Sequence, residues 1–345
     1  MKPPSLLLLC LFSFMLWGCA SEKPHSNHSD ASQKKKISVL STTAMINDLV
    51  KTIGGEYIDT RILIPGELDP HSYQLVKGDD EKLTSAQIIF SNGLELEHGP
   101  SLKQYLQKSP KAIPLGNKIL GQNPSVILQE NGQFDPHIWM DMSLWAQTIP
   151  FITEKLSEVD PRHAPIYRKR AETLQKTLLE VHQEIRKDMQ EIPCPKRFLV
   201  TSHDAFNYFT RAYLAEEGEL SSHKWKHRFA APEGLAPDSQ LSAVDIQNVI
   251  DHLKNYQVHV LFPESNVSKD SIRKIVYAGK EHGLNLIMAQ VPLYGDAMGP
   301  PGSDGDTYIK MIQHNARTIK HYLIAYPDAP EYSIHIQESC HVKIP

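Results

Sequence analysis

The 345-residue sequence has only four cysteines, no long basic segment and no apolar run long enough to cross a membrane. Lysine and arginine number 36 against 40 aspartates and glutamates, and the longest basic run is Lys34-Lys35-Lys36, which excludes polyanion binding as the main function. The 24 prolines and 18 glycines are spread along the chain, so it is neither collagen-like nor of low complexity. Histidine, by contrast, occurs 17 times.

The N-terminus predicts export. Lys2 precedes an apolar run, Leu6 to Trp17, that is shorter than the roughly 20 residues of a membrane span, as in a signal peptide. The run ends in Leu16-Trp17-Gly18-Cys19, which resembles the lipobox of bacterial lipoproteins, in which the cysteine is lipidated. We therefore expect a signal peptide over 1–18, lipidation of Cys19 as the only membrane contact, and a polar tether over 19–36. An ordinary cleaved signal would also export the chain, to the periplasm or the outer face of the cytoplasmic membrane.

Two cysteines are left for an oxidising compartment once Cys10 leaves with the signal and Cys19 is acylated. They are Cys194 and Cys340, and whether they form a disulfide stays open because the sequence does not show their proximity. The low cysteine number favours a functional site built from nitrogen and oxygen rather than sulfur.

Strand and helix patterns alternate in two series, which predicts an α/β fold of two similar lobes, each a mainly parallel sheet flanked by helices. The length agrees, since one domain typically has roughly 100 to 200 residues. We expect an N-terminal lobe over 37–159, a C-terminal lobe over 192–326 and a tail over 327–345. The first series has strands at 37–40, 57–63 and 88–90 and helices at 45–53 and 79–86. The second has strands at 198–201, 258–262 and 284–289 and helices at 204–213, 244–253 and 270–282.

Between the lobes, residues 160–191 predict one long linking helix. Apolar residues recur there every three or four positions, which keeps them on a single stripe: Tyr167, Ala171, Leu174, Leu178, Val181 and Ile185. A helix over Pro161 to Met189 would be about 42 Å long at about 1.5 Å per residue. Pro165 leaves two shorter helices as the alternative, but a proline in a first turn costs little. We therefore expect a rigid rod that joins the lobes.

Three histidines fall in loops that follow strands, where ligands bind in open α/β sheets. His71 ends the tripeptide Asp69-Pro70-His71, His137 ends Asp135-Pro136-His137, and His203 follows the strand at 198–201. Such a tripeptide is not expected twice by chance at this composition. The aspartate before proline is held extended and the proline fixes φ, so each loop presents its imidazole stiffly. Preorganised imidazoles are what a tight metal site requires.

A carboxylate is expected to complete the site, because three neutral imidazoles leave a tetrahedral shell open and the charge of a divalent cation uncompensated. The best candidate is Asp296, just beyond the strand at 284–289. Asp304 and Asp306 nearby, and Glu264 after the strand at 258–262, are its competitors. The residue pattern alone leaves Asp296 only modestly ahead.

Several motifs together resemble the metal-binding solute-binding proteins of ABC importers, the group that carries zinc, manganese or iron. They are Val39-Leu40-Ser41-Thr42-Thr43, Asp69-Pro70-His71-Ser72-Tyr73, Asp135-Pro136-His137-Ile138-Trp139-Met140-Asp141, Val200-Thr201-Ser202-His203-Asp204-Ala205-Phe206, and Leu293-Tyr294-Gly295-Asp296-Ala297-Met298-Gly299 followed by Tyr308-Ile309-Lys310-Met311 and Asn315. The resemblance covers roughly Ile37 to Tyr326. It implies that His71, His137, His203 and Asp296 hold one metal ion in the cleft between two lobes joined by one long helix. We expect two ligands from each lobe.

This sequence departs from the zinc-specific members of that family, which have a long histidine-rich acidic loop before the second histidine block. Residues 121–133 contain no histidine. The segment 215–236 is longer than in many relatives, and we expect a surface insertion there, with His223, Trp225 and His227. Scattered histidines of the tether and the tail are interpreted as bystanders: His25, His28, His335 and His341.

The resemblance predicts a monomeric carrier, not an enzyme, that captures a divalent metal and delivers it to the permease, and through it the ATPase, of an ABC transporter. Zn²⁺ ranks first on ligand softness, Mn²⁺ second and Fe²⁺ third, because the latter two gain from more oxygen donors. The alternatives are a surface-exposed metal-dependent adhesin and an exported metallohydrolase. A hydrolase needs an open coordination position for an activated water, and no His-Glu-x-x-His motif is present.

Overall fold

The computed structural model describes residues 36–130, 132–237 and 241–325. These residues belong to one compact unit that begins at Lys36. Within these ranges no helix combines the length and the apolar character that crossing a membrane requires. The predicted signal peptide, lipidation site and tether, with His25 and His28, lie outside the described residues, as do the tail, Cys340, His335 and His341.

The N-terminal part of the described chain is built on a four-stranded sheet in the order β2-β1-β3-β4, and every pairing is parallel. Its strands are β1 (Ile37–Ser41), β2 (Ile58–Ile62), β3 (Ile88–Ser91) and β4 (Ala112–Pro114). The helices between and after them are α1 (Ala44–Gly54), α2 (Asp79–Ser85), α3 (Pro100–Lys108) and α4 (Leu115–Gln122). The predicted alternation of strand and helix and the parallel sheet are confirmed, within one or two residues at each boundary. The sequence had not indicated α3, β4 or α4.

A hairpin and two helices complete this part. The hairpin strands are β5 (Gln129–Glu130) and β6 (Gln133–Phe134), and the helices are α5 (Met142–Trp145) and α6 (Ile149–Val159). A short 3₁₀ turn, η3 (Ile138–Met140), lies between them and buries Trp139 against Trp145. His137 therefore lies in the short stretch between the hairpin and the buried η3 turn.

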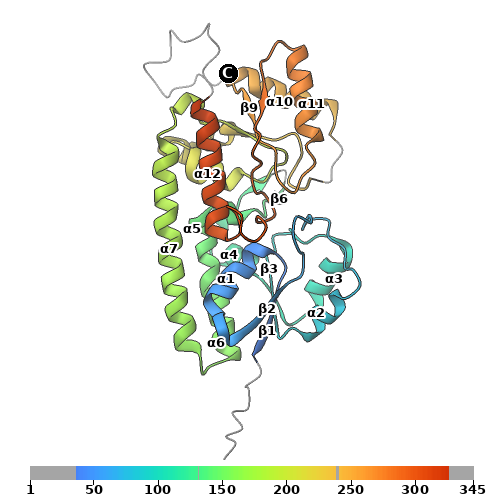
Figure 1. Cartoon of the computed structure of the whole chain (residues 1–345), viewed down its shortest axis with the longest axis vertical. Helices are drawn as coiled ribbons and strands as arrows, with labels where there is room; N and C mark the ends of the chain where they lie inside the picture. The colour runs from blue at the N-terminus through green and yellow to red at the C-terminus, as the bar shows by residue number, and fades with distance from the viewer. Residues whose placement is uncertain (1–35, 131, 238–240, 326–345) are drawn as a thin grey trace, which may run out of the picture. The chain divides into compact units, whose positions relative to one another are not determined.

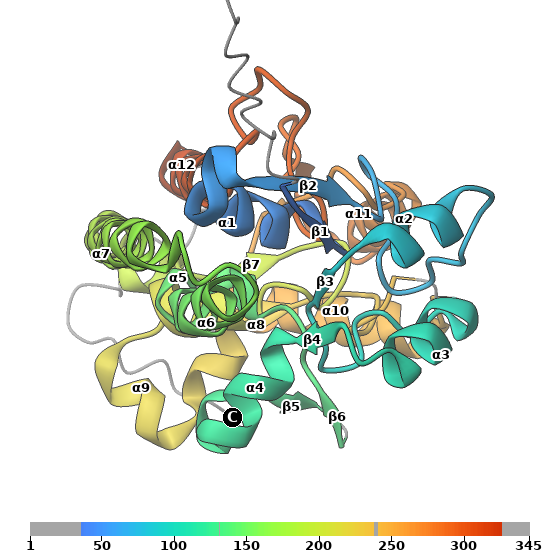
Figure 2. The ribbon, with the colours of Figure 1, turned by 90° about the horizontal axis from the view of Figure 1, so that it is seen from below.

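The long helix predicted between the two series is present as α7 (Ala164–Gln190), one uninterrupted helix of 27 residues with Pro165 in its first turn. Its stripe is buried as expected, at Tyr167, Ala171, Leu174, Leu178 and Ile185, and Val181 packs against the core. The helix contacts α1, α5 and α6 of the N-terminal part and α12 (Tyr308–Ala325) of the C-terminal part. Figure 1 shows α7 and α12 running side by side, and Figure 2 shows α6 and α7 end on.

The C-terminal part has two short parallel strand pairs, β7 (Leu199–Val200) with β8 (Phe229–Ala230) and β9 (Val260–Leu261) with β10 (Ile287–Met288). A parallel bridge from Thr201 to Phe262 joins the pairs into one layer. Its helices, besides α12, are α8 (Asn207–Phe209), a π-helical turn η6 (Thr210–Leu214), α9 (Glu217–Ser222), α10 (Ala243–Asn255) and α11 (Asp270–Glu281). The strands are shorter than predicted, and the helix expected over 204–213 is replaced by α8 and η6.

The expectation that 215–236 is a surface insertion is wrong for its second half. Trp225 and Arg228 are buried, and β8 of this segment pairs with β7. The Arg228 guanidinium donates to the backbone oxygens of Cys194 and Arg197 and pairs with Glu219. The segment therefore supplies a strand and a buried cation to the C-terminal core, while His223 and His227 remain exposed.

One large core cluster crosses from the N-terminal part to the C-terminal part, so α7 is not the sole connection between them. The start of α12 is fixed to α1, because the carboxylate of Asp48 accepts a hydrogen bond from the Tyr308 backbone N–H at 3.1 Å. The same Tyr308 donates its hydroxyl to the Trp139 carbonyl at 2.7 Å. The loop that carries Asp296 is thus followed by a helix anchored to the N-terminal part.

Candidate metal centre

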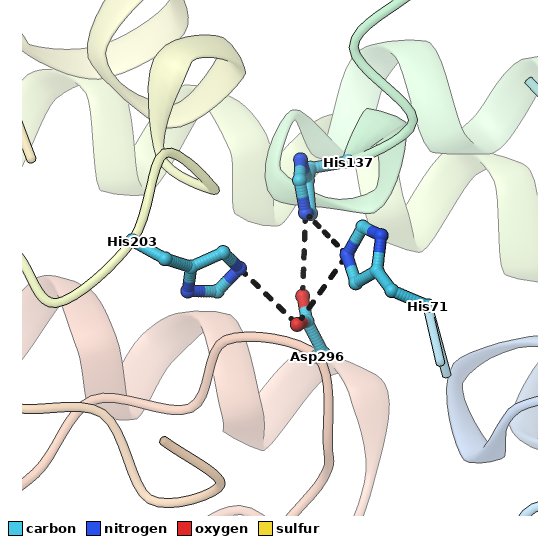
Figure 3. Close-up of side chains that lie close together, drawn as sticks. All are labelled: His71, His137, His203 and Asp296. Atoms are coloured by element: carbon cyan, nitrogen blue, oxygen red, sulfur yellow. Dashed lines mark hydrogen bonds and ion pairs between the residues drawn. The ribbon is translucent and has the colours of Figure 1, made fainter. Parts of the chain in front are cut away.

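The structure brings together all four side chains that the sequence had singled out. His71 lies in the loop after β2, His137 just before η3, His203 after β7 and Asp296 in the loop between β10 and α12. Their ligand atoms lie within 4.8 Å of one another, and all four residues are buried. Figure 3 shows the three imidazoles and the carboxylate converging on one point from separate loops.

The distances between these atoms match those between the donors of a small cation. Nε2 of His71 lies 3.2 Å from Nε2 of His137, and Nε2 of His203 lies 3.1 Å from Oδ2 of Asp296. His137 Nε2 is 3.4 Å from Oδ1 of Asp296, and His71 Nε2 is 3.6 Å from Oδ2. Donors at about 2.0 to 2.1 Å from a tetrahedral ion are about 3.3 Å apart. Nε2 of His203 and Oδ1 of Asp296 are also buried without a hydrogen-bond partner, which a bound cation would satisfy.

Asp135 orients the His137 ring. Its Oδ1 accepts from the His137 backbone N–H at 2.9 Å and lies 2.8 Å from Nδ1 of the same residue. Asn207 of α8 donates to the other oxygen at 3.0 Å, so the C-terminal part holds this aspartate as well. With Nδ1 on the aspartate, the ring presents Nε2 to the site in the form that binds a metal.

Glu264, 61 residues further along the chain, orients the His203 ring. One oxygen accepts the backbone N–H groups of Ser202 and His203, both at 3.0 Å, and the other lies 2.8 Å from Nδ1 of His203. Gly295, which precedes Asp296, lies against this carboxylate: a Cβ there would be 2.2 Å from Oε2 of Glu264 and would force it to shift. The sequence had offered Glu264 as a competing ligand, and the structure places it behind His203, outside the cluster of four.

The other two competitors do not reach the cluster. Asp304 is exposed, and Asp306 pairs with Lys310 at 2.8 Å and accepts the Gly302 N–H at 2.9 Å. Asp296 is instead 3% exposed and faces all three imidazoles with its two oxygens. The residues that sequence reasoning missed are Asp135 and Glu264 as orienting groups. Asp135 could have been identified from the sequence, because it belongs to the tripeptide that ends in His137.

The electrostatics of the cluster are dominated by burial and by the anions around it. Burial lowers the pKa of His71 well below its usual value, and Asp296 only partly offsets this. For His203, burial would also lower the pKa, but Glu264 and Asp296 together raise it well above its usual value. Burial would raise the pKa of Asp296, but His203 and the other imidazoles lower it, so this carboxylate is ionised. The two carboxylates thus favour the protonated form of His203, with which an incoming cation competes.

Asp204, next to His203 in the sequence, is a buried carboxyl group with a raised pKa. Burial and the negative charge of Asp135 raise the pKa of Asp204 to about 8. Asn207 bridges the two, donating to Asp204 at 2.8 Å and to Asp135 at 3.0 Å. Near neutral pH Asp204 is therefore mostly protonated.

Comparisons with known proteins identify the family of this chain. Residues 39–322 match the family model described as zinc-uptake complex component A, periplasmic. The metal-binding protein YtgA of Chlamydia trachomatis is 38% identical over 312 residues, which is 90% of this chain and 92% of YtgA. The manganese-binding lipoprotein MntA of Bacillus subtilis is 32% identical, over 91% of this chain and 97% of MntA.

Two solved structures show the same fold. A crystal structure of Fe(III)-bound YtgA from Chlamydia trachomatis superposes with a TM-score of 0.79 at 38% identity, over 84% of this chain and 98% of the other. The periplasmic zinc-binding protein TroA from Treponema pallidum superposes with a TM-score of 0.75 at 30% identity, over 84% and 99%. The predicted resemblance is thus confirmed over most of the described chain. This protein belongs to the family of the zinc-uptake component A, the metal-binding solute-binding proteins of ABC importers.

Proposed function

We propose that this protein captures a transition-metal ion with His71, His137, His203 and Asp296 and delivers it to the permease of an ABC importer. The observation that carries the proposal is the convergence of four buried donors from four separate loops, within 4.8 Å of one another. A buried carboxylate facing three imidazoles is costly unless the groups are paired or bind a cation. Membership of the family supports the transport role.

Zn²⁺ is our first choice of cargo, followed by Mn²⁺ and then iron. Three imidazoles and one carboxylate suit zinc. The two oxygens of Asp296 face different imidazoles, Oδ1 towards His137 and Oδ2 towards His203, so a bidentate carboxylate would offer five donors. This geometry would favour manganese or iron, which gain from oxygen ligands. Relatives have been described with zinc, manganese and Fe(III), so the cargo must be measured.

Transport suits the geometry better than hydrolysis. The carboxylates nearest to the cluster, Asp135 and Glu264, are already engaged by ring and backbone N–H groups, which leaves neither as a general base for water. His137 and His203 are fully buried, and the other two donors nearly so, which leaves little access for a substrate. Release of a metal so enclosed requires the loops to separate, which a permease would drive by binding the open state more tightly.

The test is elemental analysis of the protein purified from its native host, followed by zinc and manganese competition titrations on the stripped protein. We expect one equivalent of metal per chain and tight binding of one zinc. Asp296→Ala should lose the site. Asp304→Ala is the matched control, because it removes an exposed carboxylate from the same loop and should bind like the natural protein. Stoichiometric metal retained by Asp296→Ala would overturn the ligand assignment, and absence of metal from the natural protein would overturn the function.

A further inference from the structure

The three imidazoles of the cluster are not held equally. His137 and His203 each have a carboxylate on Nδ1, at 2.8 Å in both cases. Among the described residues none forms a hydrogen bond or ion pair with Nδ1 of His71. Asp69 holds the His71 backbone N–H at 2.8 Å, as Asp135 holds that of His137, but its second oxygen binds Ser72 instead of the ring. His71 is therefore the least restrained member of the cluster.

A fourth histidine lies on the outer side of His71. The rings of His98 and His71 have centroids 5.6 Å apart, close to the 5.2 Å and 5.4 Å that separate neighbouring rings within the cluster. His98 is partly exposed, whereas His71 is 2% exposed. Nδ1 of His98 lies 3.2 Å from the Glu95 carbonyl oxygen. A ring that donates Nδ1–H to this carbonyl carries its lone pair on Nε2, the form that binds a metal.

The backbone holds His98 in this place. The N–H of Gly99 donates to the His71 carbonyl at 3.0 Å, and a Cβ on Gly99 would lie 2.0 Å from the Tyr73 carbonyl oxygen, so the two loops touch. On the other side, Leu94 and Glu95 have φ of 52° and 64°, which is rare for residues with a side chain. Such conformations persist only where the surroundings impose them.

Buried contacts impose the conformation of this loop. Glu97 accepts the backbone N–H groups of Asn92 at 2.7 Å and Gly93 at 3.1 Å, and Leu94 donates its N–H to Asn117 at 2.9 Å. Glu97 also accepts the Thr42 hydroxyl at 2.6 Å, which ties the loop to the residue just after β1. The segment that ends in His98 is therefore a fixed part of the site and not a loose surface loop.

We propose that His98, which lies beside His71 and is more exposed, is a transient metal ligand that passes the ion to and from His71. This inference rests on the proposed function. His98 contacts neither Asp296 nor the two braced histidines, so it is not part of the final set of four donors. A group that binds the ion only transiently lowers the free-energy barrier to both binding and release. It leaves the free energies of the free and the bound ion unchanged. His98 should thus control the rates of binding and release but not the affinity.

The test is stopped-flow kinetics with Zn²⁺ and a fluorescent zinc chelator on the stripped full-length protein. For His98→Ala we expect the association and dissociation rate constants to fall together, by about fivefold, the loss of roughly 1 kcal/mol at the barrier, with the dissociation constant unchanged. His259→Ala is the matched control, because its imidazole is also partly exposed and has Nδ1 3.3 Å from a backbone carbonyl, but it precedes β9, away from the cluster. His98→Gln repeats the test with a polar side chain in case alanine disturbs the loop.

The possible outcomes separate this inference from the proposed function. Rate constants unchanged in both His98 variants would overturn the transient role while leaving the carrier function intact. A weaker affinity with faster release and unchanged association would also overturn it, because His98 would then be a permanent ligand. If the natural protein fails to bind zinc or manganese at one equivalent, the proposed function itself fails.

Discussion

Replacing Glu264 by glutamine should weaken metal binding without removing any ligand. The natural carboxylate accepts two backbone N–H groups on one oxygen and faces Nδ1 of His203 at 2.8 Å with the other. A glutamine has one oxygen and one NH₂ group. With the oxygen on the backbone, the NH₂ faces the ring and favours a lone pair on Nδ1, which moves the ring proton to Nε2, the atom aimed at Asp296. With the amide flipped, the NH₂ opposes two backbone donors.

When a metal occupies Nε2, the ring proton must sit on Nδ1, so the NH₂ opposes a donor in either orientation, the ring in the first and the backbone in the second. Loss of an orienting partner of this kind typically costs 10- to 100-fold in metal affinity. That corresponds to about 1.4 to 2.7 kcal/mol. The assay is a chelator competition titration with zinc on the stripped protein. Glu97→Gln is the matched control: Glu97 is also a buried glutamate that accepts two backbone N–H groups, but it contacts no ring of the cluster. The reasoning is refuted if Glu264→Gln folds and binds zinc within about twofold of the natural protein, a change of about 0.4 kcal/mol.

Three further predictions concern His137, Gly295 and His252. His137→Ala should abolish the metal-induced rise in melting temperature, which at a ligand concentration of about 1,000 times the dissociation constant corresponds to about 4 kcal/mol, and an unchanged rise would contradict the ligand assignment. Gly295→Ala should weaken zinc binding in the same titration, because the added Cβ would displace the Glu264 carboxylate. An affinity equal to that of the natural protein would contradict this, since the loop would then have moved to accommodate the Cβ. Burial and His227 lower the pKa of His252 to about 4, so the unfolded chain binds this proton more tightly, and His252 should contribute a loss of about 3 kcal/mol of stability to the stripped protein as the pH falls from about 6.5 to about 4. Urea denaturation at several pH values checks this, and His252→Gln should reduce the loss; equal losses would count against it.

The parts of the fold that follow local rules could be predicted from the sequence. The stripe from Tyr167 to Ile185 defines α7, because a 3.6-residue period is a property of the segment alone. The short strands β7, β9 and β10 were overestimated, since an apolar run shows burial but not where backbone pairing stops. The buried Arg228 was missed because its partners, Cys194 and Arg197, come from a different segment, and the burial of Trp225 was missed with it.

The sequence by itself indicated two of the three imidazoles of the cluster, His71 and His137, because each Asp-Pro-His loop is stiffened by its own proline and by an aspartate that binds the histidine N–H two residues on. It did not determine how those rings are held. The two loops have the same tripeptide, yet only Asp135 reaches the ring of its histidine, since Asn207 of a distant helix helps to fix it. Likewise, Glu264 orients a ligand rather than acting as one, because the loop after β9 places its carboxylate beside Nδ1 of His203 and not beside Nε2. Such contacts depend on how strands 60 or more residues apart align, and that alignment exists only in the folded chain.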